Sequence, residues 1–182
     1  MTINRSDLTF INADQAKVIQ DGVCAAQDLG FNCRLQVDGK FFARGQRRVR
    51  IQGVTYGPFA LNSNDEPFPG RNIVAEDFAL MRTADINSIR TYHEPPEWLL
   101  RQADEQGIGV FVDVPWRKHL CFLESEEAQK EARVFVRQMA QRCRNHSSIL
   151  AYSIGNEIPP NIVRWHGAAQ VQRFLAELMD VC

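Results

Sequence analysis

The sequence predicts an α/β protein built on a parallel sheet. Four nearly continuous apolar segments recur between residues 49 and 154, and each is followed by a segment in which apolar residues have helical spacing. Strands that are apolar on both faces are typical of a parallel sheet covered by helices. An open doubly wound sheet and a (β/α)8 barrel both fit this order. Both architectures place their chemistry at the carboxyl ends of the strands.

Residues 1–34 are predicted to form an N-terminal helical appendage, separate from a main domain at residues 35–182. Apolar residues of this segment recur at roughly helical spacing at Ala16, Ile19, Val23, Ala26 and Leu29. Asn12 or Asp14 is suited to cap this helix, and Gly30 is suited to end it.

The pair Asp38-Gly39 predicts a β-hairpin. Leu35-Gln36-Val37 precedes this pair and Phe41-Phe42 follows it. Asp-Gly between two apolar runs is a strong signal for a tight hairpin turn. We expect a local ribbon that would cover the bottom of a barrel.

From residue 48 onward, strands are expected at 49–56, 87–91, 108–114 and 149–154. The first three are followed by helices expected at 73–84, at 97–106 and from Ser125 to Cys143, and the fourth by a short helical turn near 163–166 and a final helix beyond Gly167. Pro96 before the second helix and Gly107 after it follow the usual asymmetry of helix ends. Ser125 is a good N-cap, and acidic residues follow it in the first turn, where the helix dipole favours them.

Composition and motifs exclude several classes of function. The 182 residues carry a net charge of −1, without the basic footprint of a nucleic-acid-binding protein. No apolar run approaches the ~20 residues of a membrane helix, and the N-terminus lacks a secretory pattern. The first strand is followed by neither of the glycine-rich nucleotide motifs, and the five cysteines form no CxxC pair. We therefore expect no cofactor and a cytoplasmic protein with reduced thiols.

Polar and aromatic side chains follow the end of each expected strand. In chain order they are Tyr56, Arg90, His93, Asp113, Trp116, His119, Asn156 and Glu157. Carboxylates move protons, amide and guanidinium groups bind hydroxyls, and aromatic faces stack on the apolar face of a ring. This rim therefore suits a polar, ring-shaped ligand such as a sugar.

Three segments that include these strand ends resemble the corresponding segments of one protein family. They are Gly53 to Gly57, Asn87 to His93 and Ile149 to Glu157. Together they are similar to the first half of the (β/α)8 (TIM) barrel in glycoside hydrolases of the β-galactosidase and β-glucuronidase family, within the large retaining clan. The resemblance covers residues 35–182. It departs from the family pattern at Ser147, where proline is usual, and at Tyr152, where tryptophan is common.

The resemblance implies a glycosidase that hydrolyses a β-linked sugar with retention. Glu157 would act first as general acid and then as general base. Asn156 would bind the sugar 2-hydroxyl, and Arg90 would keep the nucleophile carboxylate ionised. Further candidate substrate contacts are Tyr56, His93, Trp116 and His119.

A retaining mechanism needs a second carboxylate about 5–5.5 Å from the first. In the family it stands at the end of a seventh strand, beyond the four strands expected here. Asp113 is a possible substitute, but a pair with Arg90 is the simpler interpretation. We therefore expect a fragment of a longer protein, or half of a barrel that another chain completes, and no turnover by these residues alone.

Two other interpretations remain open. The chain could be a non-catalytic carbohydrate-binding or scaffold module of a larger polysaccharide-processing or glycosyltransferase-linked protein. It could also associate with itself through the open edges of its first and fourth strands.

Overall fold

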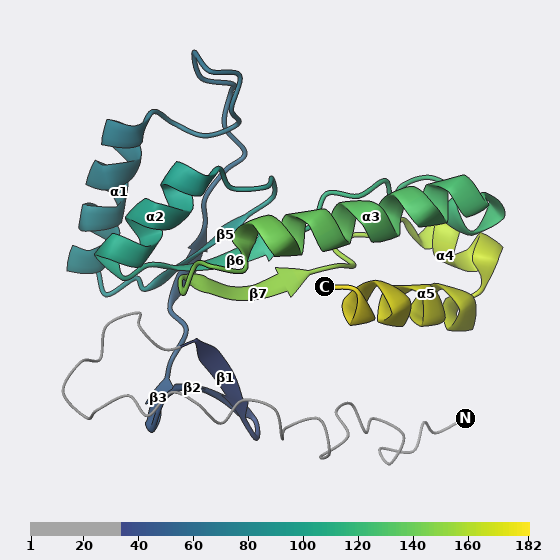
Figure 1. Cartoon of the computed structure of the whole chain (residues 1–182), viewed down its shortest axis with the longest axis horizontal. Coiled ribbons are helices and arrows are strands. Elements are labelled where there is room, and N and C mark those ends of the chain that lie inside the picture. The colour runs from purple at the N-terminus through teal and green to yellow at the C-terminus, as the bar shows by residue number, and fades with distance from the viewer. Residues whose placement is uncertain (1–33) are drawn as a thin grey trace.

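The computed structural model describes residues 34–182, and Figure 1 shows their arrangement. A small antiparallel sheet precedes a four-stranded parallel sheet, and helices alternate with the parallel strands. The predicted α/β class and partial barrel are confirmed. The helix expected within residues 16–29 lies outside the described residues.

The hairpin at Asp38-Gly39 is confirmed. Strands β1 (Leu35–Asp38) and β2 (Phe41–Arg44) pair antiparallel, and Gly39 takes the left-handed backbone (φ +59°) that the turn needs. A third strand, β3 (Arg47–Val49), pairs with β2 and was not expected.

The parallel sheet has the order β4-β5-β6-β7, so consecutive strands are neighbours. Its members are β4 (Gly53–Thr55), β5 (Ser88–Thr91), β6 (Gly109–Asp113) and β7 (Ile149–Ser153). Within the described residues, β4 and β7 each pair on one side only. The sheet therefore has two open edges, where a closed barrel has none.

The expectation of one strand across residues 49–56 is wrong, because the segment is divided between two sheets. Val49 pairs with Phe42 in the antiparallel sheet, and the parallel sheet begins only at Gly53. Between them, the Asn87 side chain donates to the Arg50 carbonyl (2.7 Å) and accepts from the Gln52 amide (2.9 Å). A side-chain amide thus satisfies backbone groups that a continuous strand would give to a ladder.

Each expected helix after residue 48 is present. They are α1 (Arg71–Thr83), α2 (Glu97–Gln106), α3 (Glu126–Cys143), α4 (Pro160–His166) and α5 (Ala168–Asp180), with a short 3-10 helix, η3, at Phe122–Glu124. Ser125 Oγ accepts the Ala128 amide (3.1 Å), which confirms the predicted cap of α3. No helix in the described part of the chain is long and apolar enough to cross a membrane.

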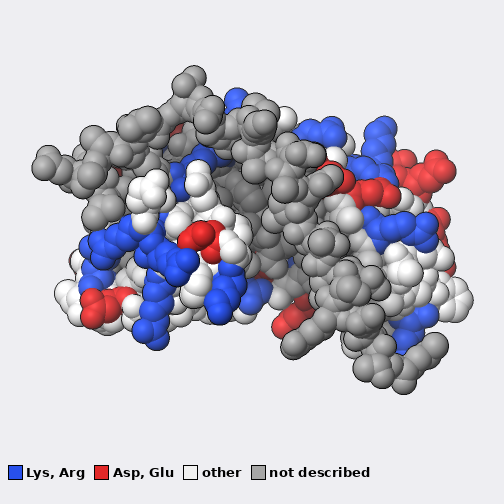
Figure 2. Space-filling view, turned by 90° about the horizontal axis from the view of Figure 1, so that it is seen from below, with Lys and Arg blue, Asp and Glu red and all other residues white. Residues whose placement is uncertain are grey.

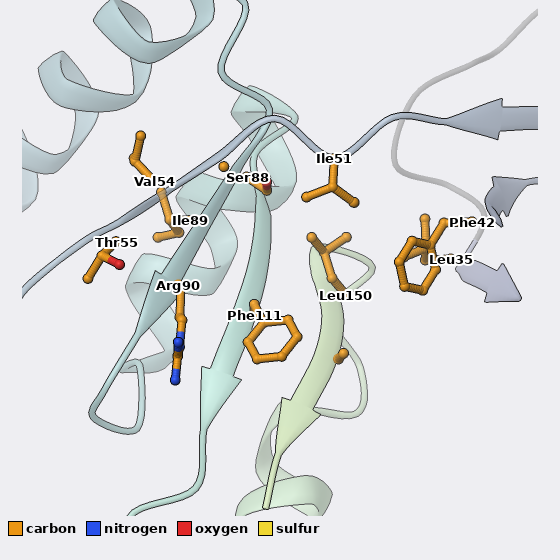
Figure 3. Close-up of a pocket in the computed structure, with 12 residues that line it drawn as sticks. Leu35, Phe42, Ile51, Val54, Thr55, Ser88, Ile89, Arg90, Phe111 and Leu150 are labelled. Atoms are coloured by element: carbon orange, nitrogen blue, oxygen red, sulfur yellow. The ribbon is translucent and has the colours of Figure 1, made fainter. Parts of the chain in front are cut away.

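The two faces of the parallel sheet differ in how they are covered. Side chains such as Ile89, Val110 and Val112 are fully buried in the core formed with the helices. On the other face, a hollow of about 400 Å³ opens between the strands and the small sheet. Phe111 and Leu150 line this hollow, which is shown in Figure 3. The inner face of this half-barrel is therefore apolar and open.

Candidate active site

Three polar side chains from successive strand ends meet at the carboxyl edge of the sheet. Arg90 lies on β5, Asp113 is the last residue of β6, and Asn156 follows β7. Arg90 Nη2 donates to Asp113 Oδ2 (2.9 Å) and to Asn156 Oδ1 (2.6 Å). One guanidinium therefore ties three strands together, as expected where parallel strands end at one rim. The simpler interpretation of Asp113, a pair with Arg90, is confirmed.

The Arg90–Asp113 ion pair is asymmetric in its exposure. The Asp113 side chain is 2% exposed, whereas that of Arg90 is 35% exposed. Within the described residues, Asp113 Oδ1 and Arg90 Nε have no hydrogen-bond partner. Each member of the pair therefore keeps one polar atom that can still form a hydrogen bond. The buried negative charge of Asp113 is compensated by Arg90.

Aromatic rings hold the Arg90 side chain in place. Its guanidinium carbon lies 5.1 Å from the centre of the Tyr92 ring and 5.9 Å from that of Phe111. A guanidinium over an aromatic face is attracted by the ring quadrupole. The position of Arg90 is thus set before any ligand arrives.

Glu157 directly follows Asn156 in an exposed turn. Its backbone is left-handed (φ +50°), which is uncommon for a residue with a side chain. Within the described residues, no hydrogen bond or ion pair holds its carboxylate. The candidate acid/base therefore stands at the rim with a strained backbone and a solvent-facing side chain.

The charges of this cluster also act on Lys118, which was not among the expected rim residues. Burial lowers the pKa of its ammonium, while the carboxylates of Asp113 and Glu157 raise it and Arg90 lowers it further. Lys118 is half-buried, and within the described residues it forms no hydrogen bond or ion pair with these three groups. The one sequence feature that could have pointed to Lys118 is its position between the expected rim residues Trp116 and His119.

Tyr56 and Trp116 are buried in the core, at 5% and 4% exposure. The Tyr56 hydroxyl donates to Asp77 Oδ2 on α1 (2.6 Å), and burial together with this carboxylate raises its pKa. Trp116 Nε1 donates to the Ile154 carbonyl (2.7 Å), and its ring packs edge-on against Phe122 and Phe174. Both rings thus support the rim from within the core.

Within the described residues, the two candidate histidines form no hydrogen bond or ion pair with the Arg90 cluster. His93 is half-buried after β5, and His119 is exposed in the loop after β6. Neither imidazole makes a hydrogen bond within the described residues. Likewise, no group of three or more metal-ligating side chains gathers in this part of the chain.

The turn into β7 is fixed from α2. Asp104 Oδ2 lies 2.6 Å from His146 Nδ1, while its Oδ1 accepts the Ser148 amide (2.7 Å) and the Ser147 hydroxyl (3.2 Å). The hydroxyl of Ser147, one of the two departures from the family pattern, is thus bound by the same carboxylate as the Ser148 amide. This anchor sets the start of the strand that ends at Asn156 and Glu157.

Comparison with known proteins gives one consistent result. Residues 64–179 match the family described as glycosyl hydrolases family 2, TIM barrel domain. The chain is 31% identical over 138 residues to a β-galactosidase of Arthrobacter sp. (strain B7), covering 71% of this chain and 13% of that protein. It is 27% identical over 127 residues to a β-glucuronidase of Chlorocebus aethiops, covering 60% of this chain and 19% of that protein.

Solved structures show the same fold. A β-glucuronidase of Parabacteroides merdae with glycerol in its active site superposes with a TM-score of 0.66 at 22% identity, covering 81% of this chain and 18% of that one. A β-galacturonidase of Eisenbergiella tayi bound to galacturonate superposes with a TM-score of 0.58 at 25% identity, covering 80% of this chain and 26% of that one. The chain thus spans less than a fifth of the sequence relatives it matches.

Proposed function

Because this chain belongs to glycosyl hydrolase family 2, as part of its TIM barrel domain, we propose that it supplies the acid/base half of a retaining glycosidase site. The substrate is a carbohydrate with a β-linked O-glycosidic bond. The observation that carries this proposal is the double contact of Arg90 with Asp113 and Asn156. It fixes the position of the amide that precedes Glu157.

The reaction divides into two steps, and Glu157 acts in both. In the first step, its protonated carboxyl gives a proton to the glycosidic oxygen as the bond to the anomeric carbon breaks and a carboxylate nucleophile bonds to that carbon. In the second step, the Glu157 carboxylate takes a proton from water, which displaces the nucleophile. The exposed turn leaves Glu157 accessible to a leaving group and then to water.

The other rim residues prepare the site for the sugar. Asn156 binds the 2-hydroxyl, a contact that strengthens in the transition state. Arg90 provides a positive charge at the rim that favours an ionised nucleophile carboxylate nearby. Lys118 adds a second cation, whose pKa the Glu157 carboxylate raises. His93 and His119 are sugar contacts at the margin, while Tyr56 and Trp116 act through packing.

We further propose that the nucleophile comes from outside these residues, at the end of a seventh strand, as the family resemblance implies. Asp113 is poorly suited to the role because it is 2% exposed and its charge compensates Arg90. The isolated 182-residue chain is therefore expected to hydrolyse no glycoside. Turnover of a nitrophenyl β-glycoside by this chain, lost in Glu157→Gln, would overturn that expectation.

The acid/base role is tested in a protein that holds this chain together with the seventh-strand carboxylate. Glu157→Ala is expected to lower kcat/KM by about 10²–10⁴-fold on an alkyl glycoside, whose leaving group needs the proton. A dinitrophenyl glycoside needs no acid and should still form the glycosyl-enzyme. Added azide should then speed turnover and give a β-glycosyl azide. Equal losses on both substrates without azide rescue would exclude Glu157 as acid/base.

A second candidate is a non-catalytic carbohydrate-binding or scaffold module. The observation that favours it is the Glu157 carboxylate, which no described residue orients. This candidate predicts that Glu157→Gln leaves sugar affinity unchanged and that no completed protein shows hydrolysis. Calorimetric titration with a β-linked disaccharide, alongside the kinetic assay, separates the two functions.

A further inference from the structure

A second pocket lies at the opposite edge of the parallel sheet. Its volume is about 430 Å³, and its lining includes five arginines: Arg44, Arg47, Arg48, Arg50 and Arg82. Arg50 precedes β4, and Asn87 and Gly107, which also line the pocket, precede β5 and β6. The pocket therefore opens at the amino ends of the strands, away from Glu157. Figure 2, which shows the molecule from below, shows Lys and Arg side chains gathered on the left of this view.

The positive charge of this pocket is compensated only in part. Arg48 forms an ion pair with Asp38 (2.9 Å), but both side chains are more than half exposed, so the pair is weak. Within residues 34–182, Arg47, Arg50 and Arg82 form no ion pair, and all three are exposed. The pocket thus keeps most of its charge available to a ligand.

The strand register places two of these cations on one face of the small sheet. Arg44 and Arg47 are direct Cα partners across β2 and β3. Like charges directly opposite each other in an antiparallel pair are destabilising. Arg44 Nη1 donates to the Ser147 carbonyl (3.1 Å), and the Asp104 carboxylate offsets part of its charge. An anion bound at the exposed Arg47 guanidinium would lower the repulsion from the other strand.

We infer that this pocket binds an acidic oligosaccharide whose charges are carboxylates or phosphates. Guanidinium groups bind both oxyanions through paired N–H donors, and they outperform lysine in this role. Val49, Ile51 and Leu150 add apolar lining that suits the C–H face of a sugar ring. The volume lies within the range of small-ligand pockets.

The choice of a carbohydrate rests on the proposed function, whereas the anion chemistry rests on the arginines alone. Binding at the amino edge does not require Glu157, so a failure of hydrolysis would leave this site untouched. The site would hold an acidic chain on the face opposite the catalytic rim. It would add affinity for long acidic glycans over short or neutral ones.

Calorimetric titration of the 182-residue chain tests this site with three probes: trigalacturonate for carboxylates, fructose 1,6-bisphosphate for phosphates, and maltotriose as the neutral control. At least one acidic probe should bind at about 50 mM salt and weaken clearly at about 200 mM, because part of the affinity is electrostatic. Maltotriose should not bind at this pocket. Whichever acidic probe binds more tightly identifies the charged group.

Two charge-reversal variants locate the site. The double variant Arg47→Glu/Arg50→Glu should weaken the acidic probe by about tenfold or more, since two guanidinium contacts are lost. Arg137→Glu, at an exposed position on α3, makes the same kind of change elsewhere and should alter affinity less than about twofold. Thermal unfolding followed by circular dichroism confirms that each variant is folded.

Three results would overturn the inference. They are no binding of either acidic probe at millimolar concentration, equal affinity for maltotriose, and equal weakening by Arg137→Glu and by the double variant. Tighter binding of a single-stranded oligonucleotide than of either acidic sugar would also overturn it, in favour of a nucleic-acid site.

Discussion

Arg90 Nη2 lies 2.6 Å from Asn156 Oδ1, although the two residues are 66 positions apart in the chain. The same nitrogen lies 2.9 Å from Asp113 Oδ2. A single guanidinium from β5 therefore orients the end of β6 and the turn that carries Glu157. The rim depends on this residue more than on any other side chain that the structure places there.

Substitution of Arg90 should cost stability as well as function. In Arg90→Met, the buried Asp113 carboxylate loses its compensating charge, and we expect the free energy of unfolding to fall by about 3 kcal/mol. Urea denaturation measures this change. The double variant Arg90→Met/Asp113→Leu should recover most of the loss, because no unpaired charge remains buried. A loss below about 1 kcal/mol in the single variant would show that water compensates Asp113.

The Asp104 anchor of β7 should be equally sensitive. Asp104→Ala removes the acceptor for the Ser148 amide, the Ser147 hydroxyl and His146, and should lower the free energy of unfolding by about 3 kcal/mol. The neighbouring Glu105, which is exposed, provides the control. Its alanine variant should change stability by less than about 0.5 kcal/mol in the same urea experiment. Equal effects of the two variants would contradict the anchoring role.

A buried thiol should make stability fall in alkali. Burial raises the pKa of the Cys143 thiol from its ordinary value of 9.0 to about 11. Between these values the folded state keeps a proton that the unfolded state releases, so the free energy of unfolding should decrease as pH rises, by up to about 1.4 kcal/mol per pH unit.

The part of this slope that belongs to Cys143 can be isolated by substitution. Cys143→Ala should reduce the alkaline slope and leave the part that comes from Cys182, Tyr152 and Tyr56, whose pKa values burial also raises. Cys121→Ala, at an exposed position, should keep the full slope. Urea denaturation at half-unit steps from about pH 8.5 to pH 10.5 gives the comparison. Identical slopes for both variants would assign the loss to other groups.

The open apolar hollow should make the isolated chain associate. Exposed apolar surface and unpaired strand edges both favour contact with another molecule. Light scattering should show a mass that rises with concentration. Phe111→Ser, inside the hollow, should reduce this association, whereas Leu80→Ser, at a side chain 66% exposed on α1, should not. A monomer at every concentration would exclude association through this face.

The sequence predicted the parts of the fold that follow from local patterns. Apolar periodicity and end signals such as Ser125 and Gly107 located the helices within a few residues. The three strands that follow the first strand were also found, because their apolar runs are continuous. Since parallel strands end at one rim, the meeting of Arg90, Asp113 and Asn156 followed from their positions at strand ends.

The features that the sequence did not predict depend on tertiary contacts. The division of the first strand depends on the Asn87 side chain, which reaches residues more than 30 positions away. The burial of Tyr56 depends on α1, and that of Trp116 on α5. Lys118 was not predicted because its partial burial depends on how the loop after β6 folds. None of these contacts leaves a local pattern in the chain.

The contact between Arg90 and Asn156 also fixes the polarity of the amide. Because Oδ1 accepts from the guanidinium, one of its two lone pairs is occupied, whereas both Nδ2 protons remain available as donors within the described residues. In the role proposed for Asn156, a sugar 2-hydroxyl therefore meets mainly a donor, and the proton of the hydroxyl can go to an acceptor on the opposite side. A 2-fluoro substituent, which accepts but cannot donate, would then keep the contact with Asn156 and lose the contact with that acceptor.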